Sequence, residues 1–97
     1  MEARYSVYLL NCDNRCFYTG IAVDPQQRLE QHRSGKPPGA KFTRGFKNLE
    51  LVFHVPVGNR SEAQTIEHFL KKMPKKSKQS IINSQPTLIE LKAILFT

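Results

Sequence analysis

Two β-forming segments near the start of the chain, separated by only a few turn residues, place the tightest constraint on how it folds. Residues 4–10 are rich in aromatic and β-branched side chains, and residues 16–21 have the same character. Between them lie Asn11, Asp13 and Asn14, which favour tight turns because their side chains hydrogen-bond to the nearby backbone. The sequence therefore predicts an antiparallel β-hairpin at the N-terminus.

The next segments combine a helix start with a third β-forming stretch. Asp24 followed by Pro25 predicts the N-terminus of a helix, because aspartate caps the first turn and proline fits there. This helix should run to about residues 34–35. Leu29 is its main apolar residue, so one helix face is left for something other than packing. Residues 49–57 are strongly β-forming and predict a third strand.

The second half of the chain predicts helices that pack on the sheet. Ser61 and Gln64 have the spacing of a capping box for a helix through about Met73, whose apolar residues recur at helical spacing. A last helical segment covers about residues 86–96. The order β-β-α-β-α-α predicts an α+β fold, in which a small three-stranded antiparallel sheet is flanked by helices. We expect residues 1–97 to form a single domain.

The net charge of +7 is unevenly distributed along the chain. The stretch between Glu30 and Glu50 and the stretch between Glu67 and Glu90 each contain five basic residues and no acidic one. Such stretches favour a polyanion as the partner, because lysine and arginine release counterions from phosphates. A basic surface without a partner is the alternative. The residues expected to contact nucleic acid are Lys36, Lys41, Arg44, Lys47, Lys71, Lys72, Lys75 and Lys76.

Several classes of protein are disfavoured by the sequence. No apolar run approaches the roughly 18 residues of a membrane span, and the first residues lack the features of a signal peptide. We therefore expect a cytoplasmic protein with no membrane partner. Cys12 and Cys16 have no second pair of ligands that would complete a zinc site. A hairpin disulfide is the alternative to reduced thiols, which the missing secretory signal favours.

Five residues with chemically useful side chains stand out from this pattern. Tyr8 and Tyr18 lie near the middles of the hairpin strands, whereas Arg28 and His32 are four residues apart on one helix face. Glu67 falls within or beside the apolar stripe of the second helix, where a carboxylate is rare unless it is paired or binds a metal. The pattern alone is equally consistent with a metal site and with an internal ion pair between Glu67 and Arg28.

The order and spacing of these residues resemble the GIY-YIG nuclease family. Ser6-Val7-Tyr8 stands at the position of the GIY triplet, and Tyr18-Thr19-Gly20 stands at that of the YIG triplet. Arg28 and His32 follow on the next helix, and residues 60–67 are similar to the family's helix with the metal-binding glutamate. The segment AKFTRG looks like the loop of small stand-alone bacterial members, and the resemblance covers most of the chain.

The chain departs from the family pattern at three positions. Ser6 replaces the glycine of the first triplet and Thr19 replaces the isoleucine of the second, and neither change removes a functional group. Ile21 stands where some active members carry a lysine that would lower the pKa of a tyrosine. Arg28, a bound metal ion and His32 then remain as the cations that lower it, which predicts an alkaline optimum.

The resemblance implies an active site made by Tyr8, Tyr18, Arg28, His32 and Glu67. Glu67 would bind one divalent cation, Mg²⁺ or Mn²⁺, with water and phosphate oxygens completing the shell. Arg28 would brace a phosphate oxygen with its planar guanidinium. Tyr8 would be the general base and Tyr18 would position water or phosphate, while His32 would relay a proton or contact the phosphate.

These expectations lead to one hypothesis of function and one alternative. The hypothesis is a metal-dependent endonuclease, a hydrolase of DNA phosphodiester bonds in DNA repair, recombination or processing, with RNA left open as a substrate. The alternative is a nucleic-acid-binding module with a nuclease fold and little or no catalysis. No separate recognition domain fits in 97 residues, so specificity would come from DNA shape or from a protein partner. The protein is expected to be a monomer or a weak dimer.

Overall fold

Strand β1 (Tyr5–Cys12) occupies the centre of a three-stranded antiparallel sheet with the order β2-β1-β3. Its neighbours are β2 (Cys16–Ala22) and β3 (Leu49–Gly58). The computed structural model that shows this sheet describes residues 3–34 and 45–96 of the chain. The α+β class and the three-stranded antiparallel sheet are therefore confirmed.

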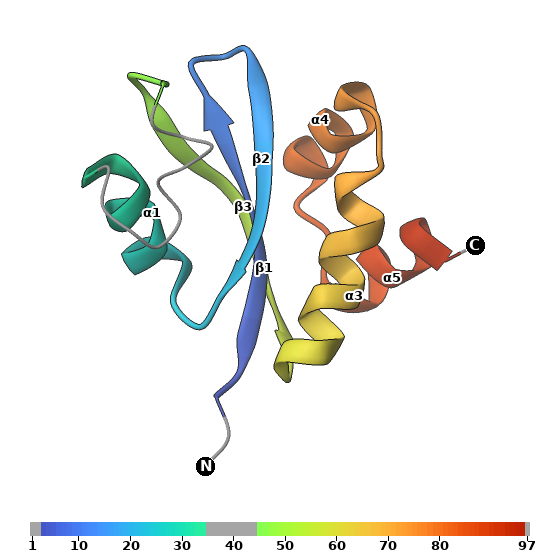
Figure 1. Cartoon of the computed structure of the whole chain (residues 1–97). Coiled ribbons are helices and arrows are strands. Elements are labelled where there is room, and N and C mark those ends of the chain that lie inside the picture. Colours follow the sequence, from blue (N-terminus) through green and yellow to red (C-terminus); the bar gives the residue numbers. More distant parts are fainter. Residues whose placement is uncertain (1–2, 35–44, 97) are drawn as a thin grey trace.

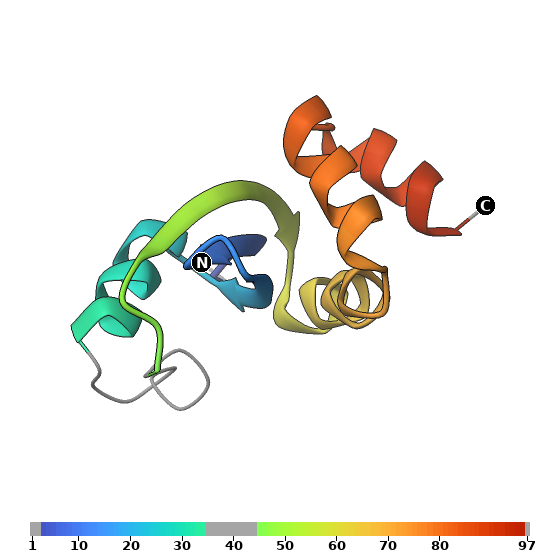
Figure 2. The ribbon, with the colours of Figure 1, turned by 90° about the horizontal axis from the view of Figure 1, so that it is seen from above.

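Helices cover both faces of this sheet. Helix α1 (Pro25–Ser34) lies on one side, and the other side carries α3 (Arg60–Lys71), α4 (Lys75–Ser84) and α5 (Leu88–Phe96), as Figures 1 and 2 show. Within the described ranges, no helix combines the length and the apolar character that crossing a bilayer requires.

Alternate residues of β1 pack into two separate apolar layers, as the period of a strand requires. Tyr8 and Leu10 are buried on the side of α1, where they join Leu29 and Leu49. Val7 and Leu9 are buried on the opposite side against α3, in a layer that contains the buried stripe of that helix, Ala63, Ile66 and Leu70. Every residue from Ser6 to Leu10 is therefore shielded from water.

The hairpin turn between β1 and β2 uses the chemistry that its sequence supplies. Asp13 and Asn14 have φ angles of 54° and 58°, a left-handed conformation that these residue types tolerate. The Asn11 side chain donates to Asn14 Oδ1 at 2.8 Å and accepts from the Asn14 N–H at 3.1 Å. The Asp13 carboxylate accepts backbone N–H groups of Lys47 at 3.1 Å and Asn48 at 2.6 Å. These bonds tie the turn to the chain that enters β3.

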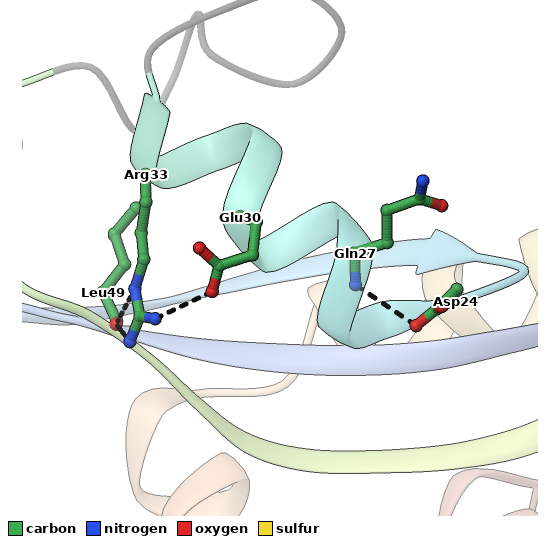
Figure 3. Close-up of polar contacts among 5 residues, drawn as sticks. All are labelled: Asp24, Gln27, Glu30, Arg33 and Leu49. Atoms are coloured by element: carbon green, nitrogen blue, oxygen red, sulfur yellow. Dashed lines mark hydrogen bonds and ion pairs between the residues drawn. The ribbon is translucent and has the colours of Figure 1, made fainter.

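Helix α1 begins where the Asp-Pro pair predicts, and its last turn is attached to β3 (Figure 3). Asp24 Oδ1 accepts the N–H of Gln27 at 3.1 Å. Arg33 donates from Nε and Nη2 to the carbonyl oxygen of Leu49, at 3.3 and 2.9 Å. Its Nη1 donates to Glu30 at 3.0 Å. The guanidinium of Arg33, one of the basic residues of the first acid-free stretch, is thus engaged in fixing α1 to the sheet.

Helix α3 starts with a capping box, but the predicted pair, Ser61 with Gln64, was wrong. Asn59 Oδ1 accepts the N–H of Glu62 at 2.9 Å, and Glu62 Oε1 accepts the N–H of Asn59 at 3.1 Å. Asn59 has the extended backbone that a cap requires, with φ −71° and ψ 173°, whereas Ser61 already lies inside the helix. Gln64 takes no part in the cap.

Helix α4 is an element that the sequence analysis did not predict. Pro74 and the adjacent lysines indicated only the end of the preceding helix. In the structure Pro74 is the N-cap of α4, and its carbonyl oxygen accepts the N–H groups of Ser77 at 3.0 Å and Lys78 at 3.1 Å. The signal was weak because Ile81 is the only buried residue of this helix. The segment therefore lacks a clear apolar stripe.

Replacing Asn59 with alanine should lower the free energy of unfolding by about 1 kcal/mol, because α3 loses the side-chain acceptor of its first turn. Denaturant unfolding followed by circular dichroism measures this loss. Ser61→Ala is the matched control and should change the free energy of unfolding by less than about 0.5 kcal/mol, since Ser61 is exposed and caps nothing. Equal losses in the two variants would contradict the observed cap.

Candidate functional site

A cleft of about 340 Å³ brings together four of the five residues singled out by the sequence: Tyr8, Tyr18, Arg28 and Glu67. The tyrosines come from the paired strands β1 and β2, the arginine from α1 and the glutamate from α3. Strand β2 lies at the edge of the sheet, and α1 and α3 lie on opposite sides of the sheet (Figure 1). Both helices therefore contribute residues to a cleft at this edge. Residues far apart in the chain therefore line one cleft.

The position of Tyr8 depends on the absence of a side chain at Gly20. The two residues are partners in the antiparallel pairing of β1 with β2. A methyl group on Gly20 would lie 2.5 Å from the Tyr8 hydroxyl oxygen and 2.6 Å from its Cζ atom, well inside van der Waals contact. The ring of Tyr8 thus passes directly over the backbone of β2 on its way to the cleft. This close approach is the physical reason for glycine at position 20.

The buried imidazole of His32 contacts the hydroxyl group of Tyr8. Its Nε2 atom lies 3.0 Å from the hydroxyl oxygen of Tyr8, and its side chain is 2 % exposed. The hydroxyl donates to Nε2 when the imidazole carries its proton on Nδ1. The ring of Tyr18 meets the imidazole edge to face, with centroids 5.0 Å apart. His32 is not among the residues that line the cleft, but it contacts two that do, Tyr8 and Tyr18.

Glu67 lies beside the apolar stripe of α3 and not inside it. Its side chain is 22 % exposed, and its carboxylate forms an ion pair of 3.7 Å with Lys71, one turn further along the helix. Among the described residues, no ion pair joins Glu67 to Arg28, although both line the cleft. The internal ion pair that the sequence left open as a structural role for Glu67 is therefore not observed there.

Burial controls the proton affinity of the two phenols. It is the largest of the effects that raise the pKa of Tyr8 above its ordinary value, followed by the nearby Tyr18. Burial also raises the pKa of Tyr18, and the negative charge of Glu67 adds to the rise. Arg28 lowers the pKa of both groups. Both phenols are consequently protonated at neutral pH, although the positive charge of Arg28 favours their ionised form.

The cleft also contains residues that the sequence analysis did not propose for the site. Arg60 and Gln64 line it from α3, and Tyr5 and Ile21 line it from the strands. The sequence could have identified Arg60 and Gln64, because they precede Glu67 by seven and three residues and so share its helix face. Ile21, at the position of the missing lysine, contributes an apolar wall.

The expected nucleic-acid contacts fall into three groups. Lys36, Lys41 and Arg44 lie outside the described residues. Lys75 donates from Nζ to the carbonyl oxygen of Arg15 at 2.9 Å and lies 5.9 Å from the centroid of the Phe17 ring, so it holds α4 to the hairpin. The others are exposed on the surface: Lys47, Lys71, Lys72 and Lys76.

A second, larger cavity of about 700 Å³ lies beside the hairpin turn. It is lined in part by Asp13 and Arg33, whose charged groups are already bonded to the backbone of residues 47–49. Those polar groups hold the fold together, which favours the smaller cleft as the functional site.

Comparison with known proteins finds a family model that matches this chain, together with proteins of similar sequence and structure. The model of the GIY-YIG catalytic domain matches residues 4–80. UPF0213 proteins of Yersinia pestis and Yersinia pseudotuberculosis are 40% identical over 88 residues, which cover 91% of this chain and 90% of theirs. The solution NMR structure of a UPF0213 protein from Bacillus halodurans is similar with a TM-score of 0.53 and 31% identity, over 97% of this chain and 98% of that one.

Replacing Gly20 with alanine should lower the free energy of unfolding by about 1–3 kcal/mol, because the new methyl group overlaps the ring of Tyr8. Chemical denaturation measures the loss. Gly45→Ala is the control, since no atom of the described residues lies within 4 Å of a methyl group there. A Gly20→Ala variant as stable as Gly45→Ala would show that Tyr8 does not need this close approach.

Proposed function

The chain belongs to the GIY-YIG nuclease family, and on that premise we propose that it is a metal-dependent endonuclease that hydrolyses DNA phosphodiester bonds. The observation that carries the proposal is the cleft in which a half-buried carboxylate, a guanidinium and two phenols converge. Hydrolysis of a phosphodiester needs an activated water and neutralisation of charge at phosphorus. The proposed activity resides in one domain of residues 1–97 and serves DNA repair, recombination or processing.

Glu67 is the residue that would hold the metal ion. Within residues 3–34 and 45–96, no group of three or more His, Cys, Asp or Glu side chains is arranged to bind one together. One carboxylate facing a polar cleft fits Mg²⁺ or Mn²⁺, because a hard cation of this kind keeps most of its water ligands. When bound, the ion would neutralise developing charge on the scissile phosphate. Lys71 would have to give up its ion pair with Glu67 for this role.

Arg28 is proposed to bind the scissile phosphate. It lines the cleft from α1, half-buried, and acts electrostatically on both phenols. A guanidinium binds two oxygens of one phosphate with parallel hydrogen bonds, which fixes the orientation of the group as well as its charge. Arg28 would therefore orient the phosphate for attack and stabilise its transition state.

Tyr8 is proposed as the general base, with His32 as its positioning residue. When the imidazole carries its proton on Nδ1, the Tyr8 hydroxyl would donate to His32 Nε2, and this bond would orient the phenol in the cleft. Once the phenol is ionised, its oxygen can accept a proton from the attacking water. Tyr18, which lines the same cleft, would orient the water or the phosphate.

The metal ion gives the first test. Cleavage should vanish in EDTA and return with Mg²⁺ or Mn²⁺, and Glu67→Gln should abolish this recovery because the amide is a far weaker ligand than the carboxylate. Plasmid nicking measures the activity. The variant should still fold, since its surface ion pair with Lys71 contributes only about 0.3–0.5 kcal/mol. Glu30→Gln, which removes an exposed acid outside the cleft, should cleave like the wild type.

The pH dependence gives the second test. Because burial raises the pKa of Tyr8, only a small fraction of the phenol is ionised at neutral pH, and that fraction grows as the pH rises. The rate should therefore increase across the alkaline range. Tyr8→Phe keeps the ring but should lose roughly 10²–10⁴-fold in turnover together with this alkaline limb. Single-turnover cleavage across a pH series measures both.

Further measurements distinguish the proposed role of Tyr8 from those of Tyr18 and His32. Tyr18→Phe should cost about tenfold, the value of one positioning hydrogen bond. A wild-type rate that reaches a plateau just above the ordinary pKa of histidine would show that His32, and not the phenolate, is the final proton acceptor. Wild-type turnover in Tyr8→Phe would exclude Tyr8 as the base.

The second candidate function is a nucleic-acid-binding module with little catalysis. Ile21 favours it, because an apolar side chain lines the cleft where a cation would help to ionise the phenols. In this case the wild type and Glu67→Gln would bind DNA equally well, and neither would nick it with either metal ion.

A further inference from the structure

Helix α3 presents a continuous polar stripe to the cleft. Arg60, Gln64 and Glu67 are spaced four and three residues apart, so they lie on one face of the helix, and all three line the cleft. With a rise of 1.5 Å per residue, Arg60 lies about 10 Å from Glu67 along the helix axis. The stripe is therefore longer than one phosphate group, and its two ends carry opposite charges.

The charge of Arg60 has no partner within residues 3–34 and 45–96. Its side chain is exposed, and none of the hydrogen bonds or ion pairs found among the described residues involves it. Arg33 is the contrasting case, because its guanidinium is bonded to Glu30 and to the carbonyl oxygen of Leu49. A guanidinium that lines a polar cleft without a partner in the described structure is suited to bind an anion from outside.

The distance between Arg60 and Glu67 along α3 indicates which kind of anion Arg60 would bind. A group held at Glu67 and Arg28 cannot also reach the far end of the stripe, two helical turns away. A nucleic-acid strand, however, repeats its phosphate at every nucleotide. A strand laid along α3 would therefore place another phosphate near Arg60 when one phosphate is at Glu67.

We propose that Arg60, with Gln64 beside it, binds a phosphate that flanks the scissile one, so that the substrate strand lies along α3. This inference rests on the proposed nuclease function. Arg60 donates two parallel hydrogen bonds to the flanking phosphate, and the Gln64 amide donates to an oxygen between the two phosphates. The contact is made to the backbone, so it fixes the register of the strand in the cleft without reading its sequence.

The first part of the test is equilibrium binding to a synthetic flap DNA at several salt concentrations. Arg60→Gln should reduce the magnitude of the slope of log affinity against log salt by about 0.9, the value of one phosphate contact on a duplex. Arg15→Gln is the matched control, because it removes one exposed arginine charge at the hairpin turn, outside the cleft, and should leave the slope unchanged. An unchanged slope in Arg60→Gln would overturn the proposal.

The second part identifies the phosphate. Flap DNAs with one neutral methylphosphonate each, placed at successive positions around the mapped cleavage site, are compared as substrates of the wild type and Arg60→Gln. At one flanking position the wild type should lose about 10–100-fold in affinity, seen as a higher KM with little change in kcat, whereas Arg60→Gln should lose nothing further there. Independent, multiplicative losses at every position would overturn the proposal, and so would a loss confined to kcat.

Failure of the nuclease function is distinguishable from failure of this inference. If the wild type cleaves no flap DNA with Mg²⁺ or Mn²⁺, the nuclease function fails, and with it the assignment of a phosphate next to the scissile bond. The salt slopes then still decide whether Arg60 binds the backbone. If cleavage occurs and Arg60→Gln behaves like Arg15→Gln, the nuclease function stands and the role of Arg60 is excluded.

Discussion

Burial of β1 on both faces is the constraint from which the rest of the structure follows. Residues from Ser6 to Leu10 have almost no contact with water, so each face of the sheet needs an apolar layer of its own. Helix α1 supplies one layer through Leu29, and α3 supplies the other through its buried stripe. The helices thereby stand on opposite sides of the edge strand β2, and their polar faces share the cleft there.

The same burial shapes the chemistry of the site. Tyr8 belongs to the packed layer under α1 and also to the cleft, which is possible because its ring crosses the bare backbone of Gly20. Its removal from water raises the pKa of the phenol, and Arg28 is the charged neighbour that lowers it. With Ile21 in place of a cation, the proposed base would depend more on Arg28 and on the metal ion proposed at Glu67. The Nε2 atom of the buried His32 imidazole lies 3.0 Å from this hydroxyl and holds its orientation.

Local signals predicted most of the elements, and the failures have local causes. The Asn-Asp-Asn pattern at 11–14 and the Asp24-Pro25 pair each act within a few residues, and the structure contains the turn and the helix start that they indicate. Ser61 was a plausible cap by composition, but Asn59 precedes it with the backbone conformation required. Helix α4 was missed because a lysine-rich segment with one buried residue depends on tertiary packing for its stability.

Local sequence patterns were sufficient to predict the hairpin with its two tyrosines, the helix with Arg28 and His32 on one face, and the helix that carries Glu67 beside an apolar stripe. These features follow from the periods of strands and helices and from motif spacing, which act over short distances along the chain. Three features depend instead on how the elements pack: the contact of His32 with Tyr8, the bond from Arg33 to Leu49, and the position of Arg60 in the cleft with Glu67. The first two contacts join residues 24 and 16 positions apart. They exist because α1 packs on one face of the sheet, whereas Arg60 lies in the cleft with Arg28 because α3 packs on the opposite face. No local pattern specifies either packing.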